Sequence, residues 1–256
     1  MAGGNRRQLM KEKLAGINSI VEALKAQRKI DRILVQENRQ EGKRMAELLR
    51  LARKKGIYVQ VVEKSRLDKL YTASNHQGII ALVDAYRYSS LEEVLENAAL
   101  KNEDPFLVIL DGIEDPRNFG AIVRSAEGAG VHGIIVPRHH SVTVNETVAR
   151  ASAGAIEYMP IVQAANLVST IKVLKEHGMW VIGADMEAKE YYYNLDIPAP
   201  TVLVIGGEGK GLKRLVKENC DLLLKIPMQG QLSSLNASVA AALLMYEVIR
   251  QRAINN

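Results

Sequence analysis

The feature that most constrains the fold is a set of three segments rich in Gly, Asn and Ser in the second half of the chain. They lie at 115–130 (DPRNFGAIVRSAEGAG), 204–212 (VIGGEGKGL) and 226–247 (IPMQGQLSSLNASVAAALLMYE). An apolar run or a proline leads into the small polar residues of each, and a long apolar helix pattern follows two of them. Parallel α/β domains place such polar loops at strand ends, where they lead into helix N-termini. We therefore expect the three segments to converge at one sheet edge and to form a polar pocket.

The surrounding sequence predicts a parallel α/β sheet. Apolar runs with strand character occur at 106–110, 133–136, 179–182, 201–205 and 222–226. Helical patterns occur at 119–128, 146–153, 164–177, 212–219 and 237–252. Strands that alternate with helices favour a parallel sheet covered on both faces. The last helix is apolar almost all round, with Glu247 as the only charge in 239–249. It is expected in the core or at a subunit interface, and we favour a homodimer.

The first third of the chain is predicted to be a small α/β module with a basic surface. Its helices are expected at 17–26, 43–55 and 66–71, and its strands at 32–35, 57–62 and 78–83. Lys and Arg outnumber Asp and Glu in this third, which suggests a polyanionic partner. A short helix at 91–99 lies in the boundary region. We place a disordered basic N-terminus at 1–10, the module at 11–84, a linker at 85–104 and the second domain at 105–256.

Several classes of protein are disfavoured. No apolar run reaches the roughly 18 residues that a membrane helix needs. The basic N-terminus lacks the apolar segment of a secretory signal, so a cytoplasmic location is expected. Cys220 is the single cysteine, which leaves no internal disulfide, and the five His residues form no ligand pattern, so we expect no metal. The net charge of +5 is too mild to identify a partner by itself.

The loop at 204–212 matches neither common phosphate-binding motif. A dinucleotide fingerprint has the spacing G-x-G-x-x-G, and Leu212 stands where the third glycine belongs. A Walker A loop has Ser or Thr directly after its Lys, where this chain has Gly211. What remains is a strand that ends in a flexible loop around Glu208. This carboxylate either serves chemistry or simply favours the positive end of the next helix.

The other two segments also allow a structural and a chemical interpretation. Asn118 is a suitable N-cap for the helix that follows it, and Arg124 lies outside the apolar stripe of that helix, as a solvated charge would. Ser233, Ser234 and Asn236 are all N-cap residue types, but capping accounts for only one of them. The backbone amides of this loop are suited to hold a carboxylate or a phosphate.

Together the three segments resemble the motifs of the SpoU (TrmH-type) branch of the SPOUT methyltransferases. The matching stretches are N-F-G-x-x-x-R at 118–124, G-G-E-G-x-G at 206–211 and I-P-M-x-G-x-x-x-S-L-N at 226–236. Their order, spacing and flanking strand patterns all agree. The first module is similar to the ribosomal-protein-like RNA-binding domain of one subgroup, with GINSIVEAL at 16–24 and HQGIIA at 76–81.

The resemblance implies an α/β SPOUT domain with a C-terminal trefoil knot, one of the rare exceptions to unknotted topology. It also implies a homodimer that transfers a methyl group from S-adenosylmethionine to a ribose 2′-OH without a metal. In that subgroup the substrate is a guanosine of large-subunit (23S) rRNA, either free or in an assembling particle. The alternatives are a tRNA ribose 2′-O-methyltransferase and a non-catalytic RNA-binding or ribosome-assembly factor with the same fold.

The motif positions carry over candidate residues for each role. The catalytic candidates are Arg124, Asn118, Glu208, Ser234 and Asn236. The cofactor-binding candidates are Gly206, Gly207, Gly211, Ile226, Met228 and Leu235. The RNA-binding candidates are His76, Gln77, Arg6, Arg7 and Arg117. Arg124 is expected to activate the hydroxyl as a base or, because a guanidine is almost always protonated, to bind the adjacent phosphate and orient the hydroxyl.

Overall fold

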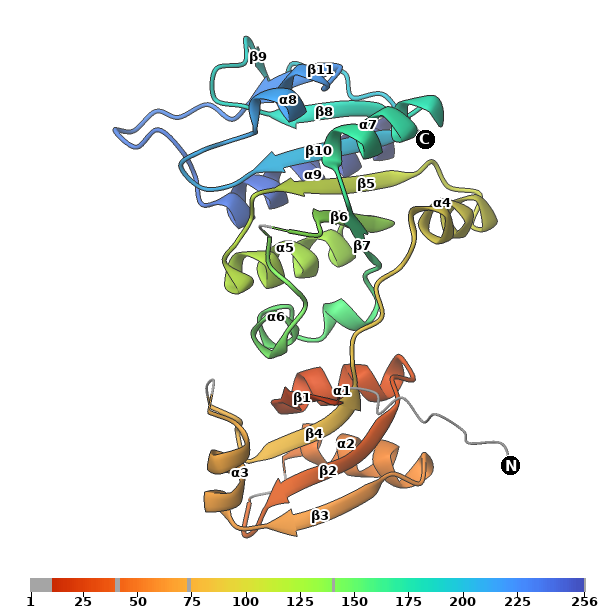
Figure 1. Ribbon diagram of the computed structural model, residues 1–256, viewed down its shortest axis with the longest axis vertical. Helices are drawn as coiled ribbons and strands as arrows, with labels where there is room; N and C mark the ends of the chain where they lie inside the picture. The colour runs from red at the N-terminus through yellow and green to blue at the C-terminus, as the bar shows by residue number, and fades with distance from the viewer. Residues whose placement is uncertain (1–10, 40–41, 73–74, 140, 256) are drawn as a thin grey trace, which may run out of the picture. The chain divides into compact units, whose positions relative to one another are not determined.

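A computed structural model of the chain describes residues 11–39, 42–72, 75–139 and 141–255, which form two compact units (Figure 1). The first unit contains the chain up to Arg87 together with Val144–Glu157, and the second contains Tyr88–Thr143 and the chain from Tyr158 onward. The predicted N-terminal segment 1–10 lies outside the described residues. The division at 87/88 lies close to the expected end of the module, whereas 144–157 was expected in the second domain.

The first unit is built on a four-stranded sheet in the order β1-β4-β2-β3. Its strands are β1 (Lys11–Ala15), β2 (Ile30–Gln36), β3 (Tyr58–Val62) and β4 (Ile79–Asp84). Its helices are α1 (Ile17–Lys25), α2 (Lys43–Lys54), α3 (Lys64–Leu70), α6 (Glu146–Ala151) and the 3-10 helix η1 (Ala155–Glu157). Strand β4 pairs antiparallel with β1 and β2, and β2 pairs parallel with β3. Strand β1 was not predicted, because only its last two residues, Leu14 and Ala15, are buried apolar side chains.

A charged cluster fastens the segment 144–157 within the first unit. Arg28 donates to Glu157 Oε1 at 2.8 Å and to Glu12 Oε2 at 2.7 Å. Its Nε and Nη2 also donate to the Asp84 carbonyl at 3.1 and 2.8 Å. Burial raises the pKa of Glu157, and the Arg28 guanidinium opposes part of that rise. A buried carboxylate of this kind needs its cationic partner, so the arginine explains why η1 stays with this unit.

The second unit contains a seven-stranded parallel sheet in the order β7-β6-β5-β10-β8-β11-β9. Its strands are β5 (Phe106–Asp111), β6 (Gly133–Pro137), β7 (Ile161–Ala164), β8 (Trp180–Ala184), β9 (Glu190–Tyr191), β10 (Thr201–Gly206) and β11 (Leu222–Lys225). Its helices are α4 (Leu91–Leu100), α5 (Pro116–Gly128), α7 (Leu167–Glu176), α8 (Arg214–Glu218) and α9 (Ala237–Asn255). Because all paired strands are parallel, their carboxyl ends share one edge, as the arrowheads of β5, β8 and β10 show in Figure 1. The predicted parallel α/β sheet is confirmed.

The central strands form the core and match the predicted strands, whereas β7 and the two-residue β9 were not predicted. All six residues of β5 are buried, as expected for a strand covered on both faces. The helix expected at 164–177 begins at Leu167, because Asn166 caps it by accepting a hydrogen bond from Ser169 N at 3.0 Å. Ala164, the first residue of the predicted helix, instead ends β7, a strand of four residues that was not predicted.

Three further features bear on function. In the described part of the chain, no helix is long and apolar enough to cross a membrane. The same residues contain no group of three or more His, Cys, Asp or Glu suited to hold a metal ion. Burial raises the pKa of the Cys220 thiol to about 12, so this cysteine is a poor nucleophile.

Candidate active site

Asn118, Glu208 and Asn236 form a hydrogen-bonded cluster at the carboxyl edge of the large sheet. Asn118 Nδ2 donates to Glu208 Oε1 at 2.8 Å, and Asn236 Nδ2 donates to the same oxygen at 2.8 Å. Asn236 Nδ2 also donates to Asn118 Oδ1 at 3.0 Å. One residue of each predicted polar segment therefore contributes to the cluster. We call these three side chains the amide–carboxylate cluster.

Helix α5 presents Asn118 to the cluster from its first turn. The helix begins at Pro116, and Asp115 is the N-cap, since its side chain accepts a hydrogen bond from Arg117 N at 2.7 Å. The suggestion that Asn118 is the N-cap was therefore wrong. With Asp115 in that role, the Asn118 amide is free to bond with Glu208.

Asn236 is held in one orientation by the start of helix α9. Its Oδ1 accepts hydrogen bonds from Ser238 N at 3.0 Å and from Ser238 Oγ at 2.6 Å. With Oδ1 occupied in this way, Nδ2 points to Asn118 and Glu208. Asn236 thus caps α9 and belongs to the cluster at once. Ser234 is exposed and takes part in none of these hydrogen bonds.

Asp111, which the sequence reasoning missed, positions the loop that carries Glu208. Its carbonyl accepts a hydrogen bond from Gly207 N at 2.9 Å, and its Oδ2 accepts one from Lys213 N at 2.8 Å. Lys213 Nζ lies 3.0 Å from Asp111 Oδ1, and the carboxylate is fully buried. The loop 207–213 is therefore tied at both ends to the last residue of β5. The sequence did contain a signal for Asp111, because it is the one acidic residue at the end of an otherwise apolar strand.

A cleft of about 620 Å³ lies between the loops that follow β5 and β10. Its lining residues are Asp111, Gly112, Ile113, Glu114, Asp115, Asn118, Gly207, Glu208, Lys210, Gly211 and Lys213. This volume is typical of small-molecule sites. The half-buried glycines and the carboxylates of this lining suit a ligand that carries both a positive charge and hydrogen-bonding groups, as S-adenosylmethionine does. The residues present therefore fit this cofactor.

The predicted cofactor residues separate into two sets. Gly207 and Gly211 line the cleft, whereas Ile226, Met228 and Leu235 are half-buried and are not among its lining residues. A Cβ on Gly206 would lie 2.6 Å from Leu212 N, so protein backbone, and not a ligand, fills the space beside this residue. At Gly207 a Cβ would meet the Gly112 carbonyl. Gly206 and Gly207 are therefore both required for the packing of the loops around the cleft.

Of Arg124 and the RNA-binding candidates, none that the structure describes contributes a side chain to the cluster's hydrogen bonds. Arg124 and Arg117 are exposed on α5, and neither side chain takes part in the cluster's hydrogen bonds. His76 is buried in the first unit, where Nδ1 accepts a hydrogen bond from Gly78 N at 2.9 Å and Nε2 lies 2.8 Å from Asp68 Oδ1. Its imidazole therefore holds the turn together, and the neighbouring Gln77 is exposed. Arg6 and Arg7 lie outside the described residues.

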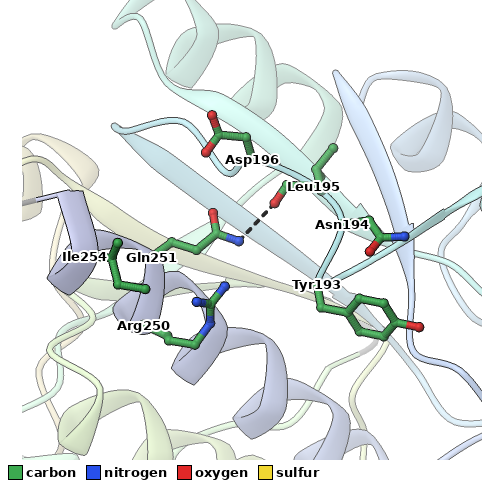
Figure 2. A pocket seen from close by; sticks show the side chains of 7 residues that line it. All are labelled: Tyr193, Asn194, Leu195, Asp196, Arg250, Gln251 and Ile254. Carbon is green, nitrogen blue, oxygen red and sulfur yellow. Dashed lines mark hydrogen bonds between the residues drawn. The ribbon is translucent and has the colours of Figure 1, made fainter.

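A second pocket, of about 250 Å³, lies between the chain after β9 and the end of α9 (Figure 2). It is lined by Tyr193, Asn194, Leu195, Asp196, Arg250, Gln251 and Ile254. Gln251 Nε2 donates to the Leu195 carbonyl at 2.9 Å, and Gln251 Oε1 accepts from Ile197 N at 2.8 Å. These hydrogen bonds hold the segment after β9 against helix α9. The amide–carboxylate cluster belongs to the larger cleft, which is the better candidate for chemistry.

The architecture and motifs agree with one family of known proteins. Residues 105–246 match the model of the SpoU rRNA Methylase family. The chain belongs to this family. Residues 13–89 match a second model, described as RNA 2′-O ribose methyltransferase substrate binding. The predictions that the protein is an RNA methyltransferase and that it has a SpoU-type α/β domain are confirmed.

Individual relatives agree with this assignment. YacO of Bacillus subtilis, named as a TrmH family tRNA/rRNA methyltransferase, is 48% identical over 237 residues, which cover 93% of this chain and 94% of YacO. The AviRb SpoU methyltransferase of Streptomyces viridochromogenes, solved with AdoMet, is 26% identical, with a TM-score of 0.78 and coverage of 98% and 94%. An RNA 2′-O ribose methyltransferase of known structure is 27% identical, with a TM-score of 0.77 and coverage of 97% and 91%. The prediction of S-adenosylmethionine as cofactor is thereby confirmed for the family.

Proposed function

We propose that this protein transfers a methyl group from S-adenosylmethionine to the ribose 2′-OH of a guanosine in large-subunit (23S) rRNA. The observation that carries the proposal is the amide–carboxylate cluster beside a cleft of about 620 Å³. The cluster offers a carboxylate and two amides in fixed orientation, which are suited to hold a hydroxyl group. The resemblance to the 23S rRNA subgroup supports the choice of substrate.

In this proposal Glu208 orients the attacking hydroxyl. Its Oε1 is already occupied by Asn118 and Asn236, so Oε2 is the oxygen offered to the 2′-OH proton. The bound cofactor supplies a methyl group that its sulfonium makes electrophilic. On transfer of that methyl group the cofactor would leave as the neutral thioether, and Glu208 Oε2 would take the proton of the 2′-OH and release it to water. Holding the reacting oxygen in line is the main contribution of the cluster.

Arg124 has a supporting role in the same reaction. It is exposed on α5, the helix that carries Asn118, and is not bonded to the cluster. A guanidinium in this setting is suited to bind the phosphate beside the target ribose, because it presents a rigid fork of donors. We therefore propose phosphate binding for Arg124 in place of direct proton abstraction.

Methyl transfer from radiolabelled S-adenosylmethionine tests the proposed reaction. The substrates are separated rRNA and tRNA that lack ribose methylation, together with precursor ribosomal particles. We expect label as 2′-O-methylguanosine in large-subunit rRNA, and we expect Arg124→Ala to reduce the rate about 10²-fold, as loss of a charged positioning contact does. Lys101→Ala, which removes one exposed positive charge at the end of α4, serves as the control. Label in tRNA alone would support the second candidate, a tRNA 2′-O-methyltransferase.

We further propose that the protein is a homodimer with a knotted C-terminal segment. The knot rests on the family resemblance. The dimer rests also on a groove of about 440 Å³ between α5 and α9, lined by Ala121, Ser125, Ser238, Val239, Ala242, Leu243 and Tyr246. Val239, Leu243 and Tyr246 are 48%, 41% and 53% exposed. Such a row of apolar side chains on a single helix is suited to pack against a second copy of itself.

Leu243→Glu is expected to convert the dimer to a monomer. A carboxylate in the centre of a self-complementary apolar interface is placed there twice, once from each subunit, and is desolvated without a partner. Sedimentation velocity measures the mass of the wild type and the variant. Leu100→Glu is the control, because Leu100 is 85% exposed at the end of α4. A monomeric wild type, or a dimer that survives Leu243→Glu, would contradict this interface.

A further inference from the structure

Three consecutive tyrosines follow one another at the end of β9, and the first and third of them are exposed. The rings of Tyr191 and Tyr193 stack with centroids 5.5 Å apart and an interplanar angle of 9°. Tyr192 meets Tyr193 edge-on, at 5.1 Å and 73°. Tyr191 is 36% exposed and Tyr193 is 49% exposed. Core packing therefore does not account for the two stacked rings, which keep much of their surface in water.

A lysine completes this surface. Lys225 pairs with Tyr191 in the register of β11 and β9, and its Nζ lies 4.9 Å from the centroid of the Tyr191 ring. Tyr192 N donates to the Lys225 carbonyl at 3.0 Å, which fixes the tyrosines to β11. Within the described ranges Lys225 takes part in no ion pair, so its charge is available to an anion. We call Tyr191, Tyr193 and Lys225 the tyrosine–lysine surface.

The position of this surface connects it with the candidate active site. Tyr191 and Lys225 end two strands of the parallel sheet, so they lie at the same edge as Gly206, which leads to Glu208. Strand β9 is three strands from β10, a separation of about 15 Å at the spacing of paired strands. Lys225 also directly precedes the segment 226–236. Figure 2 shows that Tyr193 stands at one side of the pocket whose other side is formed by α9.

We propose that the tyrosine–lysine surface binds an unpaired base of the RNA, close to the nucleotide that is methylated. Stacked aromatic rings beside a cation are suited to single-stranded nucleic acid, because a base stacks on the ring while the cation holds a phosphate. The inference rests on the proposed function for the identity of the ligand. It adds an RNA contact in the catalytic unit, separate from the first unit and from the amide–carboxylate cluster.

Two oligonucleotide probes test the role of base stacking. One is a short oligoadenylate, and the other is an abasic strand of equal length that carries the same phosphates. We expect the full-length protein to bind the oligoadenylate more tightly, and Tyr191→Ala combined with Tyr193→Ala to lower this preference about 5- to 150-fold, the range for loss of one stacked base. Tyr191→Phe with Tyr193→Phe is expected to retain the preference, because the rings remain.

The matched control is Trp180→Ala, which removes a 45% exposed aromatic side chain from the first residue of β8, at the opposite sheet edge. It is expected to leave the preference unchanged. An unchanged preference in the double alanine variant with an unchanged Tm would overturn the inference. Weaker S-adenosylmethionine binding with unchanged RNA binding would also overturn it, by assigning the rings to the cofactor. The protein could also methylate no RNA and still prefer the oligoadenylate, with the double alanine variant losing that preference. This result would support RNA binding by the tyrosine–lysine surface and contradict the proposed reaction.

Discussion

Glu208→Ala is expected to lower kcat for RNA methylation about 10²- to 10³-fold, the usual effect of removing one preorganised polar group at a reaction centre. Glu208 Oε1 accepts hydrogen bonds from both Asn118 and Asn236, so the substitution removes the group that joins the two amides. It also removes the oxygen that we propose for the 2′-OH. The Glu208 side chain is exposed, so the loss of packing is small and Tm is expected to stay within a few degrees.

Single-turnover methyl transfer at saturating cofactor and RNA measures this effect on chemistry alone. Glu176→Ala is the matched control, because Glu176 is an exposed glutamate at the end of α7. Glu208→Gln keeps the shape of the side chain and removes its charge, and we expect it to lie between the wild type and Glu208→Ala. If Glu208→Ala retains kcat within about twofold, the cluster is structural and the proposed role of Glu208 is wrong.

The parallel sheet was predictable because its strands are buried on both faces. Such strands read as continuous apolar runs, and β5 and β10 were located almost to the residue. Strand β1 was not predictable in the same way, because its first three residues are charged and only its backbone pairing with β4 makes it a strand. The two-residue β9 has no pattern of its own and exists through its pairing with β11. The two strands β1 and β9 are therefore set by backbone pairing with distant segments and could not be predicted from hydrophobic periodicity.

The candidate site shows a similar division. The motifs located Asn118, Glu208 and Asn236, since each stands at a strand end or a helix start of a parallel fold. The motifs did not show that Asp111 ties the Glu208 loop to β5, because that contact joins residues 102 positions apart. His76 was proposed for RNA contact, but its two ring nitrogens are both engaged within the first unit. A polar residue in a turn looks the same in sequence whether it faces solvent or supports the turn.

Gly206→Ala is expected to destabilise the second unit and to abolish most of its activity. The Cβ of an alanine would lie 2.5 Å from Gly211 O and 2.6 Å from Leu212 N, and both are backbone atoms that cannot move aside without shifting the loop. Overpacking of this kind costs about 3 kcal/mol at the upper end of its common range, which corresponds to a fall in Tm of about 6–12 °C in a protein of this size. The shifted loop carries Glu208, so kcat is expected to fall about 10²-fold as well.

Thermal unfolding and single-turnover methyl transfer measure the two effects in the same preparation. Gly230→Ala is the matched control for stability, because a Cβ there meets nothing within 4 Å and the backbone is not in the left-handed region. Its Tm is expected to stay within about 2 °C of the wild type. A Gly206→Ala protein with unchanged Tm would contradict the close approach of 206 and 211. A lowered Tm with unchanged kcat would show that the loop can shift without moving the carboxylate, and would separate the packing role of Gly206 from the proposed chemistry of Glu208.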